Sequence, residues 1–242
     1  MAESPSAPRF PTTHWSRVAV AGDPADPEAR AALEGLCRDY WYPLYAFARR
    51  RGLGVDDAAD LVQSFLADLI ARRDLAAADP NRGRFRSFLL AACAHYLANR
   101  RDHDRAAKRG GGRAPVSIDR MEAEGRYGRE PFHELTAERL FARRWALDLL
   151  ERALKRLEAD AAGAGQATLF THLRPALTGG GGSGPHAALA EDLGMTEGAV
   201  KMAALRLRRR YRDLLRAEIA RTVADPSDVD DEVRDLFAAL TG

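Results

Sequence analysis

The stretch HAALAEDLGMTEGAVKMAALRLRRRY, residues 186–211, constrains the fold more than any other part of the chain. It predicts a short helix, a tight turn and a longer basic helix. Gly194 can adopt the left-handed conformation that ends a helix, and Thr196 is suited to cap the helix that follows. The spacing of the small residue Ala190, Gly194 and Val200 is that of a helix-turn-helix.

The predicted second helix of this stretch has two unlike faces. One face is an apolar stripe at helical spacing, made of Val200, Ala203, Ala204, Leu207, Tyr211 and Leu214. The other face carries Lys201, Met202, Leu205, Arg206 and Arg209. Glu197, in the first turn, is favoured there by the helix dipole. A basic outer face favours insertion into a DNA major groove, and the alternative is an ordinary helical hairpin with a solvated basic face.

Composition bounds the class of protein. The chain has 242 residues, 46% of them hydrophobic, which is enough for one or two domains with cores of their own. No apolar run approaches the roughly 18 residues of a membrane span, and the N-terminal sequence lacks a signal-peptide core. Cys37 and Cys93 lack metal-ligand spacing, so we expect both to be reduced and buried in a cytoplasmic protein.

Charge is unevenly distributed, although the formal net charge is only +2. Arginine and lysine concentrate in two stretches, whereas residues 225–242 are acidic. The six histidines are scattered, and no HExxH, GxSxG or Walker motif is present. We therefore expect that the protein is not an enzyme and that it binds neither a metal ion nor a cofactor.

Helical periodicity runs through most of the chain, and no segment shows a useful length of strand alternation. The expected fold is all-α, with two small helical domains joined by a flexible linker and the helix-turn-helix in the C-terminal domain. Pro43 should kink or restart the helix in which it lies. We expect residues 1–12 to be disordered, residues 13–109 to form the first domain and residues 110–140 to form the linker. The second domain should be residues 141–224, with a glycine-rich tether at 179–184, and residues 225–242 should form an acidic tail with a short amphipathic helix.

VDDAADLVQSFLADLI, residues 55–70, is the clearest amphipathic helix. Its inner stripe is Ala58, Leu61, Val62, Phe65, Leu66 and Leu69. The side chains pointing away from that stripe are Asp57, Asp60, Gln63, Ser64 and Asp68. Such residues usually form a solvated face, and the alternative is a docking surface for a protein partner.

Residues 79–113 predict a loop followed by a helix in which aromatic and basic side chains alternate. The apolar positions are Phe85, Phe88, Leu89, Ala92 and Tyr96, and the basic ones include Arg82, Arg84, Arg86, Arg100, Arg101 and Arg105. Together with Asn81, this surface suits a nucleic acid with accessible bases, because arginines hold the backbone while rings stack on bases. The alternative is that the rings form core, which we expect for at least one of Phe85 and Phe88.

Taken together, these segments resemble bacterial RNA polymerase sigma factors of the compact extracytoplasmic-function type. DDAADLVQSFLADLI is similar to the family's polymerase-binding helix, with its Asp-Leu-x-Gln core at Asp60, Leu61 and Gln63. RGRFRSFLLAACAHYLANRRD is similar to the segment that melts and reads the minus-ten element. EGAVKMAALRLRRRY is similar to the helix that reads the minus-thirty-five element. The resemblance extends from Thr13 to about Val223.

The resemblance implies partners and site residues. The partners are the RNA polymerase core, through the clamp helices of its largest subunit and through its second-largest subunit, and promoter DNA. An anti-sigma factor or another regulator is a further candidate partner. The polymerase-binding residues would be Asp57, Asp60, Leu61, Gln63 and Ser64. The minus-ten residues would be Asn81, Arg82, Arg84, Phe85, Arg86, Phe88, His95, Asn99 and Arg100. The minus-thirty-five residues would be Thr196, Glu197, Lys201, Met202, Leu205, Arg206 and Arg209.

The sequence departs from the family pattern in several places. Phe88 stands where the family often has Trp, and His95 stands where it often has Asn. The long linker, the glycine tether and the acidic tail make this chain longer than the shortest members of the family. Charge complementarity motivates the hypothesis that the acidic tail folds over a basic face of the protein.

Two other classes of protein compete with this interpretation. A helix-turn-helix regulator that is not a sigma factor would explain residues 186–211, but it would leave the other two segments without a shared purpose. An adaptor that binds only proteins would use its basic faces for acidic partners. Salt-sensitive binding to promoter DNA would argue against such an adaptor.

Overall fold

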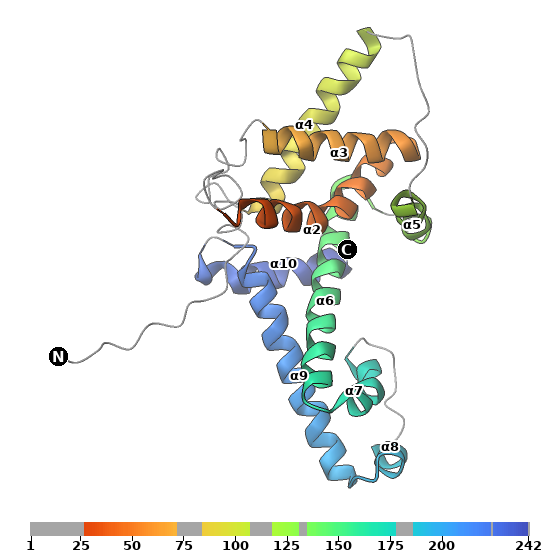
Figure 1. Ribbon diagram of the computed structural model, residues 1–242, viewed down its shortest axis with the longest axis vertical. Coiled ribbons are helices and arrows are strands. Elements are labelled where there is room, and N and C mark those ends of the chain that lie inside the picture. Colours follow the sequence, from red (N-terminus) through yellow and green to blue (C-terminus); the bar gives the residue numbers. More distant parts are fainter. Residues whose placement is uncertain are drawn as a thin grey trace, which may run out of the picture. The chain divides into compact units, whose positions relative to one another are not determined.

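The computed structural model describes residues 27–71, 84–106, 118–130, 135–177, 186–223 and 225–241. Every regular element among these residues is a helix, which confirms the all-α prediction for this part of the chain (Figure 1). Contacts group the chain into two compact units, unit 1 with Met1–Ala146 and Ala220–Gly242 and unit 2 with Leu147–Ile219. Within the described ranges, no helix is long and apolar enough to cross a membrane.

Helices α2 (Ala29–Arg50) and α3 (Val55–Ala71) pack against each other and form the centre of unit 1. Gly52 lies in the turn between them with φ of 93°, a left-handed conformation that glycine adopts without steric cost. Helix α2 continues through Pro43, so the chain does not restart there. The fully buried side chains of the pair include Leu44, Tyr45, Phe47, Leu61 and Val62.

Helix α4 (Phe85–Ala106) completes this core by packing against α2 and α3. Its buried side chains recur every four residues, at Phe85, Leu89, Cys93 and Leu97. The ring of Tyr96 is only half-buried and packs against Phe65, with ring centroids 5.6 Å apart. Cys93 is buried as expected, and burial raises the pKa of its thiol to about 12, whereas Cys37 is half-buried.

The described part of the expected linker is largely helical and belongs to unit 1. Helix α5 (Ile118–Tyr127) packs on α2 through a carboxylate that three donors share. The Arg49 guanidinium donates to both oxygens of Glu124, at 2.7 and 3.0 Å, and the Tyr45 hydroxyl donates to Oε2 at 2.7 Å. The same guanidinium lies 5.0 Å from the ring centre of Tyr127. These contacts fix α5 on α2.

A buried carboxylate, Glu130, lies just beyond α5. Glu130 accepts a hydrogen bond from the Tyr42 hydroxyl at 3.2 Å and forms an ion pair with Arg144 of α6 (Ala137–Gly163). Burial raises the pKa of Glu130, against the opposing effect of Arg144. Tyr42 also lies beneath the guanidinium of Arg126, 3.8 Å from its ring centre. Residues 118–130 are therefore joined to the rest of unit 1 at two separate points.

Unit 2 contains the C-terminal part of α6, α7 (Ala167–Leu173), the 3-10 turn η3 (Arg174–Ala176), α8 (His186–Asp192) and most of α9 (Glu197–Ala220). Two small apolar clusters hold these helices together. One consists of Leu173, Ala190, Val200, Ala203 and Ala204, and the other of Leu154, Leu157, Ala161 and Phe170. Leu207 of α9 packs against both clusters and links them.

The acidic tail is a helix of unit 1. Asp225 accepts a hydrogen bond from the Ser227 amide at 2.8 Å and caps the 3-10 turn η4 (Pro226–Asp228), which leads into α10 (Val229–Thr241). Val229 and Leu236 are buried. The amphipathic helix expected here is present, but Phe237 is 52% exposed and lies outside the buried stripe.

Replacing Glu124 by Gln should lower the free energy of unfolding by about 1 kcal/mol at pH 7, because a partly exposed charged hydrogen bond is lost. The Arg49 hydrogen bond holds the pKa of Glu124 below its ordinary value. The stabilisation is therefore present at neutral pH and is lost as pH falls through that lowered pKa. Urea unfolding at pH 7 and in acid should show the difference between wild type and variant shrinking in acid.

The matched control is Glu34→Gln, which removes the exposed ion pair between Arg30 and Glu34. Exposed pairs contribute little, so this variant should be close to wild type at both pH values. Equal destabilisation by the two variants would contradict the role given to Glu124.

Candidate nucleic-acid and protein interfaces

The turn between α8 and α9 is closed by backbone geometry. Gly194 has φ of 60°, and the Met195 amide donates to the Ala190 carbonyl at 2.8 Å. A Cβ at Gly194 would meet nothing within 4 Å apart from its own residue and its chain neighbours, so the need for glycine there comes from the backbone and not from lack of space. Thr196 then caps α9, since its Oγ1 accepts from the Ala199 amide at 3.2 Å. The helix, turn and helix expected in this stretch are present.

The two faces of α9 are separated as its sequence predicts. Val200, Ala203 and Ala204 are buried, and Leu207, Tyr211 and Leu214 are partly buried against the second cluster. On the opposite side, Lys201, Met202, Leu205, Arg206 and Arg209 are all exposed and form what we call the α9 outer face. Met202 is 53% exposed and Leu205 57%, so two large apolar side chains lie among basic ones on this face.

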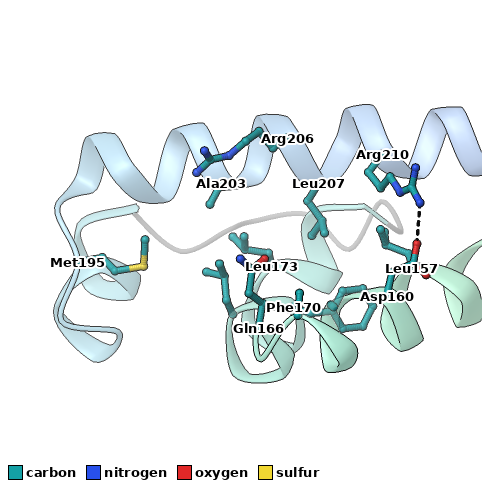
Figure 2. Close-up of a pocket in the computed structure, with 13 residues that line it drawn as sticks. Leu157, Asp160, Gln166, Phe170, Leu173, Met195, Ala203, Arg206, Leu207 and Arg210 are labelled. Atoms are coloured by element: carbon teal, nitrogen blue, oxygen red, sulfur yellow. Dashed lines mark hydrogen bonds and ion pairs between the residues drawn. The ribbon is translucent and has the colours of Figure 1, made fainter.

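Glu197 and Arg210 limit the positive charge that α9 presents. Glu197 pairs with Lys201 across one turn at 2.7 Å. Arg210 donates to Asp160 of α6 at 2.9 Å, across an apolar groove that α9 forms with α6 and α7 (Figure 2). This hydrogen bond lowers the pKa of Asp160. Arg210 thus turns toward the body of unit 2, which the run of three arginines in the sequence does not reveal.

Helix α3 presents a polar surface opposite its buried stripe. Asp57 and Gln63 are exposed and Asp60 and Ser64 are half-buried, and together they form the α3 outer face. Leu61, also predicted to bind a partner, is fully buried in the core of unit 1. Leu61 therefore anchors α3 in the core and does not itself lie on the α3 outer face.

The residues predicted on α4 separate into core and surface. Phe85 is buried and meets Tyr40 edge-on at 5.5 Å, so the expectation that one of the two phenylalanines is core is confirmed. Phe88 is half-buried and stacks on Phe85, with centroids 6.1 Å apart. His95 and Asn99 are exposed and hydrogen-bonded to each other at 3.1 Å. Arg100 is half-buried.

The two arginines at the start of α4 are paired with α10. Arg84 and Arg86 both bind Glu232, and both also reach Asp235. Sequence reasoning did not identify these two acidic partners, although the opposite charges of the two segments signalled an association. Asn81 and Arg82, predicted to act beside them, lie outside the described residues.

No group of three potential metal ligands occurs among the residues that the structure describes. Comparison of the chain with protein-family models, with curated proteins and with solved structures finds no match. Function must therefore be inferred from the surfaces described above.

Replacing Thr196 by Ala should increase amide hydrogen exchange in the first turns of α9 about fivefold, because loss of a threonine cap costs about 1 kcal/mol. Mass spectrometry of peptides from residues 197–211 measures this change. The control is Thr171→Ala, whose hydroxyl donates to the Ala167 carbonyl inside α7 and caps nothing. Unchanged exchange in Thr196→Ala, or an equal increase in α7 of the control, would contradict the capping role.

Proposed function

We propose that this protein is a sigma factor that binds RNA polymerase core and directs promoter recognition, DNA melting and transcription initiation. The observation that carries the proposal is the α9 outer face, where two exposed apolar side chains lie among lysine and arginine on the helix after a tight turn. The α3 outer face and the α4 surface supply the two further functions that a sigma factor needs.

The α9 outer face has the chemistry of a major-groove reader. The arrangement of α8, the turn at Gly194 and α9 supports a helix-turn-helix whose second helix enters the groove. Lys201, Arg206 and Arg209 would bind phosphates or guanine edges, while Met202 and Leu205 would pack against thymine methyl groups. A face that mixes basic and apolar side chains suits a groove that offers both phosphates and thymine methyl groups.

The α3 outer face would bind the clamp helices of the polymerase's largest subunit. Its carboxylates and amide are acceptors and donors for polar groups of a partner helix, and the fully buried Leu61 fixes the rotation of the helix that carries them. Contacts with the second-largest subunit belong to the same proposal.

The exposed side of α4 would hold the non-template strand of the minus-ten element. His95 and Asn99 can donate and accept hydrogen bonds with base edges, and half-buried Phe88 can contact a ring at its exposed edge. Capture of unstacked bases converts binding energy into strand separation, since unstacking costs only a few kcal/mol per base. This mechanism requires no nucleotide hydrolysis by the protein.

Replacing Lys201 by Ala should weaken binding to duplex promoter DNA and reduce the slope of log affinity against log salt by about 1, as expected for one lost phosphate contact. Fluorescence anisotropy with a promoter library measures both quantities. Lys155→Ala is the control, because Lys155 pairs with Glu151 at 2.8 Å in unit 2 just as Lys201 pairs with Glu197 at 2.7 Å. A control that loses as much affinity would show only a general charge effect.

Replacing Gln63 by Ala should weaken assembly with core polymerase about five- to tenfold, as loss of one interface hydrogen bond costs about 1 to 1.4 kcal/mol. Duplex DNA binding by the free protein should be unchanged. Gln166→Ala is the control, since Gln166 is exposed and makes no side-chain cap for α7. A chain that binds duplex DNA but never forms a stoichiometric complex with core polymerase would instead be a helix-turn-helix regulator.

A further inference from the structure

Helix α10 and the turn before it form a strongly acidic segment that contacts two arginines at the start of α4. Residues 225–242 contain six acidic side chains and one arginine. Most of the acidic side chains are exposed, but Glu232 is fully buried and Asp235 is partly buried. Glu232 and Asp235 both form ion pairs with arginines at the start of α4.

The contact between Glu232 and Arg86 is bidentate. Arg86 Nε lies 2.8 Å from Oε1 of Glu232, and its Nη2 lies 3.0 Å from Oε2. Arg84 approaches the same carboxylate from its own Nε at 2.6 Å. Two parallel N–H donors on two oxygens is also the geometry with which arginine binds a phosphate group. The Glu232 carboxylate therefore binds the same two N–H donors of Arg86 that a nucleic-acid phosphate would bind.

Asp235 extends the contact by one helical turn. It pairs with Arg84, and its Oδ2 accepts from Arg86 Nη2 at 3.2 Å. The two arginines thus share two carboxylates. Their positive charge is directed toward α10, and the Arg86 side chain is only 13% exposed.

Arg86 is also held from its other side, where its guanidinium lies 4.3 Å from the ring centre of Trp145. Stacking on tryptophan orients the planar group without consuming its N–H donors in the ring plane. Arg86 would therefore keep its orientation if Glu232 left, with the donors that now bind the carboxylate turned outward.

We infer that α10 is a built-in competitor of nucleic acid, whose Glu232 and Asp235 occupy the phosphate-binding positions of Arg84 and Arg86. The inference rests on the proposed function, because it assigns these arginines to the strand that α4 binds. A single-stranded DNA that reaches them displaces α10. Displacing α10 removes the contacts that now bury Val229 and Leu236. The cost of exposing these two side chains opposes release, so DNA displaces α10 only if its own binding offsets that cost.

The test uses the full chain carrying Glu232→Gln and Asp235→Asn, which removes both charges and keeps the side-chain shapes. Binding of a fluorescein-labelled single-stranded DNA of mixed sequence is measured by anisotropy over a range of salt concentrations. The variant should bind more tightly than wild type, and its slope of log affinity against log salt should be steeper by about 1.4, the value for two added phosphate contacts on a single strand. Asp235→Asn alone should give about half that increase in slope.

The matched control carries Asp228→Asn and Asp231→Asn. Both residues are exposed, and Asp231 pairs with Arg234 within α10 and not with α4. The net charge changes by the same amount, so a long-range effect of the acidic segment would appear equally in the control. Adding Arg84→Ala and Arg86→Ala to the test variant should abolish the gain in affinity.

Amide hydrogen exchange gives a second readout that does not depend on the substitutions. In wild type, saturating single-stranded DNA should increase exchange in residues 229–241 while leaving α2 and α3 protected. Unchanged exchange in α10 with DNA bound, or a test variant with wild-type affinity and slope, would overturn the inference. If duplex binding still depends on Lys201 in that case, only the inference about α10 fails and the proposed function stands. If the protein binds neither DNA nor core polymerase, both the inference and the proposed function fail.

Discussion

Burial of Val200, Ala203 and Ala204 fixes the rotation of α9 about its own axis, and the proposed duplex-binding surface depends on that rotation. Because these small side chains let α9 pack closely in unit 2, Lys201, Met202, Leu205, Arg206 and Arg209 have to face outward. Burial of Leu61 and Val62 has the same effect on α3 and turns Asp57 and Gln63 to the surface. The cost of leaving an apolar stripe in water therefore positions both the α3 outer face, which we propose binds polymerase, and the α9 outer face, which we propose binds DNA.

Core formation and the proposed binding of nucleic acid draw on the same kinds of side chain in this protein. Phe85 is buried in the core, and Arg210 forms an ion pair with Asp160. Arg84 and Arg86 are held by the carboxylates of α10. Among the described residues, the α9 outer face keeps its basic side chains exposed, and His95 and Asn99 are exposed on α4.

Periodicity predicted the all-helical fold and the buried sides of α3 and α9, because each of these helices places its apolar residues on one stripe. The turn at Gly194 and the cap at Thr196 were also predictable, since both depend on local backbone chemistry. The docking of α5 on α2 was not, because it depends on Glu124 meeting Tyr45 and Arg49 from 75 or more positions away. For the same reason, the sequence could indicate an attraction between tail and basic segment but not that Glu232 would be its buried centre.

Transcription in vitro gives the sharpest test of the sigma-factor proposal, because the α3 and α9 outer faces would have to act together in it. Core RNA polymerase is mixed with the purified chain on a pool of genomic fragments, and the 5′ ends of the transcripts are sequenced. Under the sigma-factor proposal, we expect discrete start sites that share an upstream element and disappear without the chain. Transcripts that start at the same positions with core polymerase alone, or a chain that binds DNA yet yields no start sites, would contradict it.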